Sequence, residues 1–114
     1  MRVGVVATAI IFAMAMQGTR SAAAACERKP GQAVQASGEI DDGWIDKAGN
    51  AVYLMEDDNP ACATDGFQTY IQDPSGQLKC HAGDRVTVIG SFEAVKYDYT
   101  GSGYFIRAKS VRCG

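Results

Sequence analysis

The chain has 114 residues, a net charge of −2 from 11 basic and 13 acidic side chains, and four cysteines. This length excludes a large cofactor-binding enzyme, and the acidic balance disfavours a basic nucleic-acid binder. The first predicted element is a secretory signal peptide at residues 1–25, with Arg2 near its start, an apolar run over residues 3–16, and small residues before Cys26.

The apolar run of the expected signal peptide has 14 residues, fewer than the roughly 20 that cross a bilayer, so we expect no transmembrane segment. Cleavage before Cys26 would leave 89 residues. It would also remove Arg2 and Arg20, so the basic count falls to 9 against 13 acidic residues and the charge becomes −4. We therefore expect one domain at residues 26–114 that is periplasmic or secreted.

All four cysteines follow the expected cleavage site. An even number in a short exported chain predicts two disulfides. The gaps of 36, 18 and 33 positions do not resemble the close pairs of a zinc site. Of the three possible pairings we favour Cys26 with Cys113, which joins the two ends of the domain, and Cys62 with Cys80. A lipid on Cys26 is the alternative for that residue.

Five stretches have the alternation or composition of β-strands, and no stretch of useful length has a helical period. In chain order they cover residues 34–40, 51–55, 67–72, 84–95 and 104–109, the last continuing to Cys113. Turn-forming residues separate them, at 46–50, 56–60, 73–76 and 99–103. Only a turn or one helical turn is expected around residues 75–80. The sequence thus predicts an all-β domain.

Two glycines lie inside predicted strands at matching places. Gly38 follows Val34 by four positions, and Gly90 follows Val86 by four positions. Because glycine weakens a strand interior, the match indicates bends or bulges that a small closed barrel requires.

Together, the five strands, the Gly-Asp-Arg-Val-Thr-Val-Ile-Gly segment at 83–90 and the ending at 106–111 resemble an OB-fold. More particularly, they are similar to small exported bacterial OB-fold proteins, many of which are domains of unknown function. The resemblance covers residues 32–112. It implies a five-stranded Greek-key barrel. Ligands of that fold are held on the face of strands two and three, and by the loops after strands one and four.

Aromatic side chains in these regions are the predicted ligand contacts, because exposed rings stack on sugars or on a partner's side chains. Trp44 lies in the loop that we place at residues 41–50, and Tyr53 and Tyr70 lie on the second and third strands. The loop at residues 96–104 supplies the others, Lys96, Tyr97, Tyr99 and Tyr104. A cross-strand pair that stabilises the hairpin is the alternative for Tyr97 and Tyr104.

Few residues of the chain are candidates for catalysis. His81 is the only histidine, and its neighbour Cys80 would point to the opposite side of an extended strand. No Gly-x-Ser-x-Gly motif is present. We expect no enzymatic activity and no cofactor.

An acidic cluster is the best candidate for a metal site. It consists of Glu56, Asp57 and Asp58, with Asp41, Asp42 and Asp65 as further candidates. Calcium prefers such oxygen ligands, but the spacing does not match the EF-hand loop. We interpret the cluster as a solvated acidic rim and predict no metal.

The charge also bears on the partner. Single-stranded nucleic acid needs a positive groove, which a domain of charge −4 does not favour. We therefore expect a monomeric, non-catalytic binding protein that recognises a protein or glycan of the cell envelope through loops 41–50 and 96–104. The alternative is an inhibitor or a toxin-type binding subunit, which could assemble into a ring.

Overall fold

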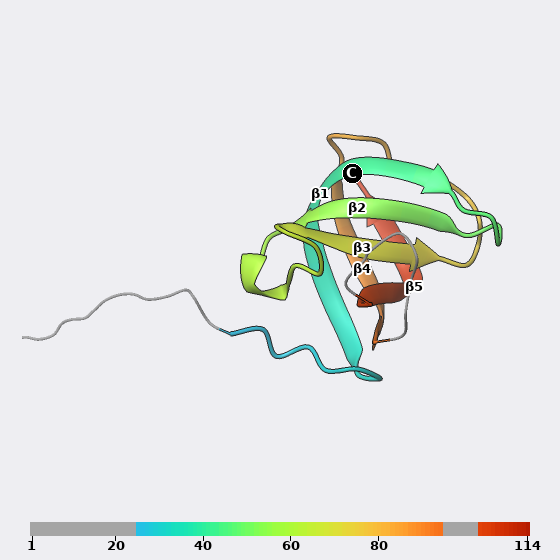
Figure 1. The fold of residues 1–114 in the computed structure, drawn as a ribbon. Coiled ribbons are helices and arrows are strands. Elements are labelled where there is room, and N and C mark those ends of the chain that lie inside the picture. The colour runs from blue at the N-terminus through green and yellow to red at the C-terminus, as the bar shows by residue number, and fades with distance from the viewer. Residues whose placement is uncertain (1–24, 95–102) are drawn as a thin grey trace, which may run out of the picture.

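The computed structural model describes residues 25–94 and 103–114, which form a closed barrel of five β-strands (Figure 1). The all-β, five-stranded prediction is confirmed. The expected signal peptide lies outside the described residues except for Ala25. The elements are β1 (Ala33–Ile45), β2 (Ala51–Asp57), the short 3-10 helix η2 (Pro60–Cys62), β3 (Gln68–Asp73), β4 (Arg85–Glu93) and β5 (Phe105–Cys113).

Around the barrel the strands follow the order β1-β2-β3-β5-β4, and β4 closes the ring by pairing with β1. All pairs are antiparallel except β3 with β5. This is the Greek-key order of an OB-fold. The helical turn of the described residues lies between β2 and β3 at η2. Around residues 75–80, where we expected a turn or one helical turn, the structure has a turn at Pro74 and Ser75 and no helix.

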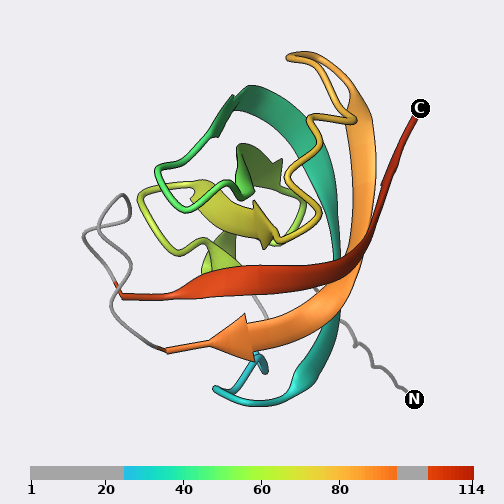
Figure 2. The same cartoon turned by 90° about the vertical axis from the view of Figure 1, so that its right-hand side faces the viewer.

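Strand β1 is longer than predicted because it serves two neighbours. Its first half pairs with β4 over residues 33–39, and its second half pairs with β2 over residues 38–45. The register with β2 shifts between Ile40 and Asp42, so a bulge at Asp41 lets the strand turn from one neighbour to the other. Figure 2 shows the resulting curve. The predicted loop at 41–50 is therefore wrong over its first half, and Trp44 lies in a strand.

Each of the two matching glycines pairs with the valine of the other strand in the β1–β4 ladder: Gly90 with Val34, and Gly38 with Val86. A Cβ on Gly38 would clash with the carbonyl of Glu56, and one on Gly90 would clash with a backbone carbonyl of β5. Both positions thus allow a neighbouring strand to approach closely. The predicted bulge is confirmed beside Gly90, but in β1 it lies at Asp41 rather than at Gly38.

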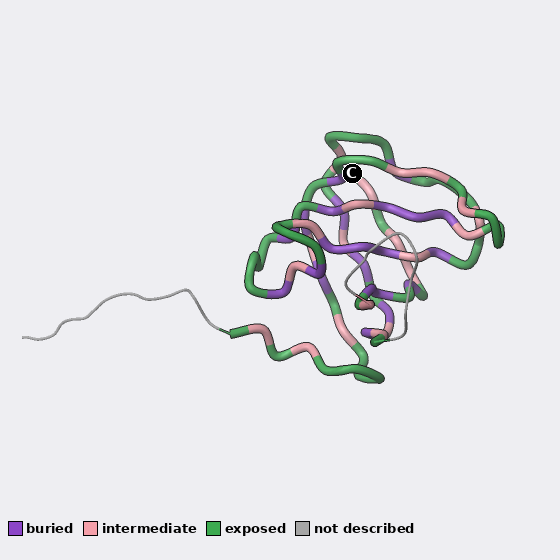
Figure 3. Tube along the Cα trace, viewed as in Figure 1, coloured by how far each residue is buried: buried purple, intermediate pink, exposed green. Residues whose placement is uncertain are grey.

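The barrel interior is filled by alternate side chains of all five strands. Figure 3 shows how buried stretches follow the strands, while the turns between them are mostly exposed. Tyr53 is the largest fully buried side chain. The interior also contains Ala36, Ile40, Ala51, Met55, Ile71, Cys80, Val86, Val88, Phe92, Ile106 and Ala108.

The predicted disulfide pairing is wrong. Cys26 is bonded to Cys62, with Cα atoms 4.9 Å apart, and Cys80 to Cys113, with Cα atoms 5.6 Å apart. The β4–β5 ladder places Cys113 opposite Val86, near the point where the chain that follows Cys80 enters β4. The first residues, 25–32, do not run to the other end of the chain. They form an extended N-terminal arm whose start is bonded to η2.

Candidate binding surface

A second hydrophobic cluster lies apart from the barrel interior. Its members alternate along their strands with core residues: Val52 and Leu54 flank Tyr53, Tyr70 precedes Ile71, and Phe105 precedes Ile106. Because successive side chains of a strand point to opposite faces, this cluster lies on the outside of the barrel, over β1, β2, β3 and β5. We call it the outer aromatic surface, and it consists of Trp44, Val52, Leu54, Tyr70 and Phe105. Val52, Tyr70 and Phe105 are buried, and Trp44 and Leu54 are half-buried.

Two of the predicted ligand-binding residues meet on the outer aromatic surface. Trp44 is half-buried and contacts Tyr70 edge to face, with ring centroids 6.4 Å apart and planes at 85°. Burial, with a smaller contribution from the Asp65 carboxylate, raises the pKa of the Tyr70 hydroxyl above its ordinary value. The guanidinium of Arg107 lies over the Phe105 ring, 5.8 Å from its centroid. The surface thus combines rings, aliphatic groups and a cation.

Tyr53 was predicted as a ligand contact, but it has no exposed surface. Its hydroxyl donates to the carbonyl of Gln77 at 3.3 Å. The same oxygen accepts from the backbone N–H of Lys79 at 2.6 Å and of Cys80 at 3.3 Å. Tyr53 therefore fastens the segment before β4 to the barrel, and a ligand on the surface does not reach it.

The remaining predicted contacts belong to the loop between β4 and β5. Tyr104 is 43 % exposed and stacks on Phe92, with ring centroids 5.6 Å apart and planes 10° from parallel. Lys96, Tyr97 and Tyr99 lie outside the described residues. Tyr104 borders a groove of about 460 Å³ that is separate from the outer aromatic surface, with Phe92, the arm and η2 as its other walls.

Sequence patterns missed several members of the surface. Val52, Leu54 and Phe105 are ordinary strand residues, and only their alternation with core residues places them outside. Ile45 and Leu78 are 47 % and 45 % exposed. Leu78 lies against Gly43, close to the end of β1. Ile45 pairs with Ala51, and Gly43 pairs with Tyr53, both of the barrel interior. Ile45 and Leu78 therefore lie on the other face of β1 from Trp44 and are not part of the outer aromatic surface.

Two members of the acidic cluster, Asp57 and Asp58, form separate ion pairs, and the expected solvated rim is wrong for Asp57. This side chain is buried and accepts two hydrogen bonds from Arg28, at 2.7 and 3.3 Å, and one from the Thr69 hydroxyl at 2.6 Å. Asp58 points elsewhere and forms a two-pronged pair with Arg85. The hydrogen bond and charge of Arg85 hold the pKa of Asp58 below its ordinary value.

Other candidate chemistry is sparse in the part of the chain that the structure describes. The side chain of His81 is 88 % exposed, with Asp84 at 3.8 Å, and Cys80 beside it is bonded to Cys113. Residues 25–94 and 103–114 contain no group of three side chains able to hold a metal ion. Within the same residues no helix is long and apolar enough to cross a membrane.

Fold and surface together define a small disulfide-bonded OB-fold barrel with an apolar patch outside it. No protein-family model matches the chain, and a search of curated proteins finds no match. Function must therefore be argued from the surface itself, because one fold serves many functions.

Proposed function

We propose that the protein is an exported, non-catalytic binding protein, periplasmic or secreted, which recognises a protein of the cell envelope through its outer aromatic surface. The observation that supports this proposal most is the second hydrophobic cluster outside the barrel. Val52, Tyr70 and Phe105 of this cluster are buried, so solvent reaches it only at the half-buried Trp44 and Leu54. A partly exposed tryptophan beside an aliphatic side chain can anchor a partner, because a large ring gains much when an interface buries it completely. In the OB-fold this face is also where ligands are usually held.

An aliphatic side chain beside Trp44 favours a protein over a glycan as the partner. A sugar stacks on flat rings and gains hydrogen bonds from polar groups around them, whereas Leu54, half-buried in the same cluster, offers neither. Buried against another protein, Leu54 and Trp44 would form the apolar centre of an interface. Arg107, at the edge of the patch, fits the polar rim that surrounds such a centre.

The test is a crosslinking capture from envelope extract with the wild-type domain, Trp44→Ala and Ile89→Ala. Ile89 is a matched control because it is 45 % exposed on β4, outside the patch. We expect Trp44→Ala to lose the partner that wild type and Ile89→Ala retain. Equal capture by all three would refute the proposal, provided that thermal melts show all three folded.

A direct measurement is possible because Trp44 is the only tryptophan. Its fluorescence should shift when the purified partner is added, since the half-buried ring would lose its remaining contact with water. Co-sedimentation with insoluble cell-wall glycan provides the competing outcome. Pelleting that depends on Trp44, in the absence of any captured protein, would replace the protein partner with a glycan.

A further inference from the structure

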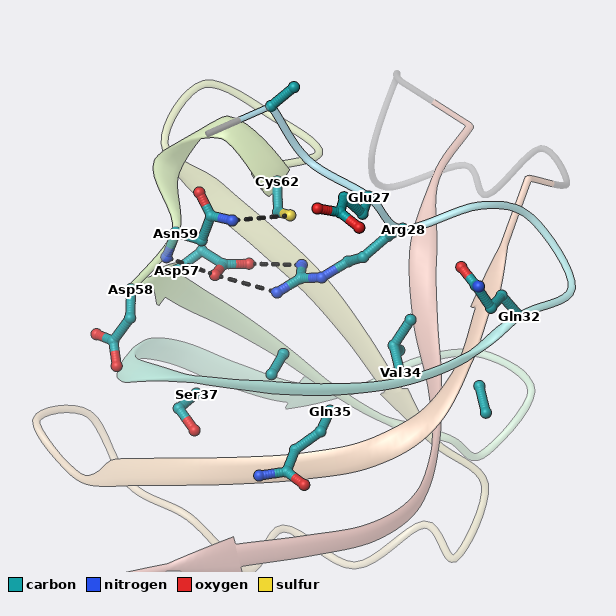
Figure 4. Close-up of a pocket in the computed structure, with 13 residues that line it drawn as sticks. Glu27, Arg28, Gln32, Val34, Gln35, Ser37, Asp57, Asp58, Asn59 and Cys62 are labelled. Atoms are coloured by element: carbon teal, nitrogen blue, oxygen red, sulfur yellow. Dashed lines mark hydrogen bonds and ion pairs between the residues drawn. The ribbon is translucent and has the colours of Figure 1, made fainter. Parts of the chain in front are cut away.

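A groove of about 520 Å³ lies on a different side of the barrel, between the N-terminal arm, the first half of β1 and the segment after β2 (Figure 4). The arm and β1 diverge from the turn at Pro30 and Gly31. The Cys26–Cys62 disulfide holds the arm to η2 at the wide end. Arg28 reaches from the arm to Asp57 there, with its side chain 10 % exposed. The groove walls are therefore fixed by a covalent bond and a buried ion pair.

One edge of β1 faces this groove without a neighbouring strand. The β1–β2 ladder begins only at Gly38, so residues 33–37 pair with β4 alone. The direction of each backbone group follows from its neighbours. Gln32 accepts from Phe92 of β4, whereas Ser37 accepts from Asp58 on the opposite side. Because directions alternate along a strand, Ala33, Gln35 and Ser37 all turn their backbone groups away from β4.

These backbone groups form a short template for an added strand. Ala33 and Gln35 each present an N–H and a carbonyl, and Ser37 presents an N–H. Among the described residues none of the five groups has a hydrogen-bond partner. Ala33 and Gln35 are exposed, and both line the groove. An extended peptide laid along this edge would pair with them as one strand of a sheet pairs with the next.

The charged side chains of the groove indicate which kind of peptide would bind there. The ionisable groups that line the groove are Glu27, Arg28, Asp57 and Asp58. Arg28 and Asp57 neutralise each other, and Asp58 pairs with Arg85 outside the groove wall. Glu27 is exposed and has no ion pair within the described residues. Among these lining side chains, the charge without an ion pair is therefore the negative one of Glu27, which lies on the arm, opposite the open edge of β1.

We propose that this groove binds an extended, positively charged segment of a partner polypeptide by adding it to β1 as a strand. The backbone of Ala33, Gln35 and Ser37 supplies the hydrogen bonds, and Glu27 meets a basic side chain of the segment. The site does not use Trp44 or any other residue of the outer aromatic surface, so it stands apart from the function proposed above.

The probe is an acetylated and amidated five-residue peptide in which lysine alternates with valine, compared with a glutamate–valine peptide of the same length. We expect the lysine peptide to bind and to slow hydrogen exchange of the Gln35 amide, followed by NMR on the intact domain. The glutamate peptide should do neither. If neither peptide slows this exchange at roughly millimolar concentration, the proposal fails.

Two variants at one position separate backbone from side chain. Gln35→Pro removes the N–H that faces the groove, at an edge where proline is tolerated because the β4 ladder does not use that N–H. We expect about tenfold weaker binding of the lysine peptide, the effect of the one lost hydrogen bond. Gln35→Ala, which keeps the N–H, should bind within about twofold of wild type. Equal affinity of folded Gln35→Pro and wild type would overturn the proposal.

A third variant keeps the test decisive even if Gln35→Pro does not fold. Glu27→Lys changes an exposed residue of the arm and leaves the strand edge intact. It should weaken the lysine peptide and admit the glutamate peptide, whereas an unchanged preference would refute the role of Glu27. Light scattering at the same protein concentrations tests whether a second copy of this chain occupies the groove instead. A dimer that Gln35→Pro abolishes would assign the β1 edge to that second copy and overturn the proposal of a separate partner.

Discussion

The two disulfides close loops of nearly equal length but join different parts of the molecule. Their cysteines are 36 and 33 positions apart, so the chain-entropy model gives each about 4 kcal/mol. Cys80 belongs to the barrel interior and Cys113 packs against it. Cys26, in contrast, fastens the arm to η2 outside the barrel. Loop length alone therefore does not rank them, because one loop ends in the core and the other in an appendage.

The largest effect should follow removal of the core disulfide. Replacing Cys80 and Cys113 together by alanine loses the loop constraint and also leaves space beside Val86 and its neighbours. We expect the free energy of unfolding to fall by more than about 4 kcal/mol. Urea titration monitored by Trp44 fluorescence measures it. A loss no greater than that of the Cys26 and Cys62 double variant would contradict the distinction between the two loops.

The buried ion pair should come next. Asp57→Ala removes the acceptor of the two Arg28 bonds, the Thr69 hydroxyl and the backbone N–H of Asn59. We expect the free energy of unfolding to fall by about 3 kcal/mol. The Thr69 hydroxyl is fully buried and would be left without its acceptor, whereas the Arg28 side chain can turn toward water.

A double-mutant cycle identifies the interaction responsible. Arg28→Ala leaves the Asp57 carboxylate buried without its cation, and so should also be strongly destabilising. The double variant should lose much less than the sum of the two single changes. Additive losses would show that Arg28 and Asp57 do not stabilise each other.

The disulfide of the arm should have a smaller effect than its loop length indicates. When Cys26 and Cys62 are both replaced by alanine, the arm can detach from η2 while the barrel stays folded. The folded state then gains conformational entropy as the unfolded state does, and the two gains partly cancel. We expect a loss of roughly 2 kcal/mol, half the chain-entropy value. The amide of Gly31, which donates to Phe92, should exchange faster while core amides stay protected. Equally faster exchange throughout the barrel would show that the arm belongs to the cooperative core.

Local patterns were enough to predict the barrel but not its cross-links. Alternation and the intervening turn residues predict strands β2 to β5. The two glycines mark positions where neighbouring strands approach closely. The disulfide pairing depends on which strands are neighbours in space. Nothing near Cys113 in the sequence indicates that β5 runs beside β4 and ends near Cys80. The end of β1 was missed because Asp41, Asp42 and Gly43 are turn-forming residue types, whereas the strand continues through a bulge at Asp41.

The site was predictable only where aromatic residues mark it. Trp44 and Tyr70 were found by residue type and do meet. Tyr53 was chosen by the same reasoning but is buried. A tyrosine in a predicted strand can point into the barrel or out of it, and only the register decides between the two. Arg28 and Asp57 lie 29 positions apart, so their ion pair could not be read from either local sequence. The open edge of β1 is likewise a property of the ladder, not of its residues.

The smallest effect should come from the exposed ion pair between Asp58 and Arg85, which ties the segment after β2 to β4. Both side chains are more than half exposed, so water and salt screen them. At neutral pH, Asp58→Asn should lower the urea midpoint slightly. Glu56→Gln is the control, since Glu56 is exposed and precedes the same segment.

The pH dependence decides whether the contribution of Asp58 is electrostatic. Arg85 lowers the pKa of Asp58 in the folded protein, and Asp58 in turn raises the pKa of Arg85, which stays charged throughout the measured range. A carboxyl whose pKa is lower when folded stabilises above its unfolded value, about 3.9, and loses that effect as pH falls through the folded value. The difference between wild type and Asp58→Asn should therefore close below about pH 4. A difference that persists at lower pH would mean that the pair holds the segment after β2 to β4 through packing and neutral hydrogen bonds, so that this contact resembles the core more than the exposed positions of its charges indicate.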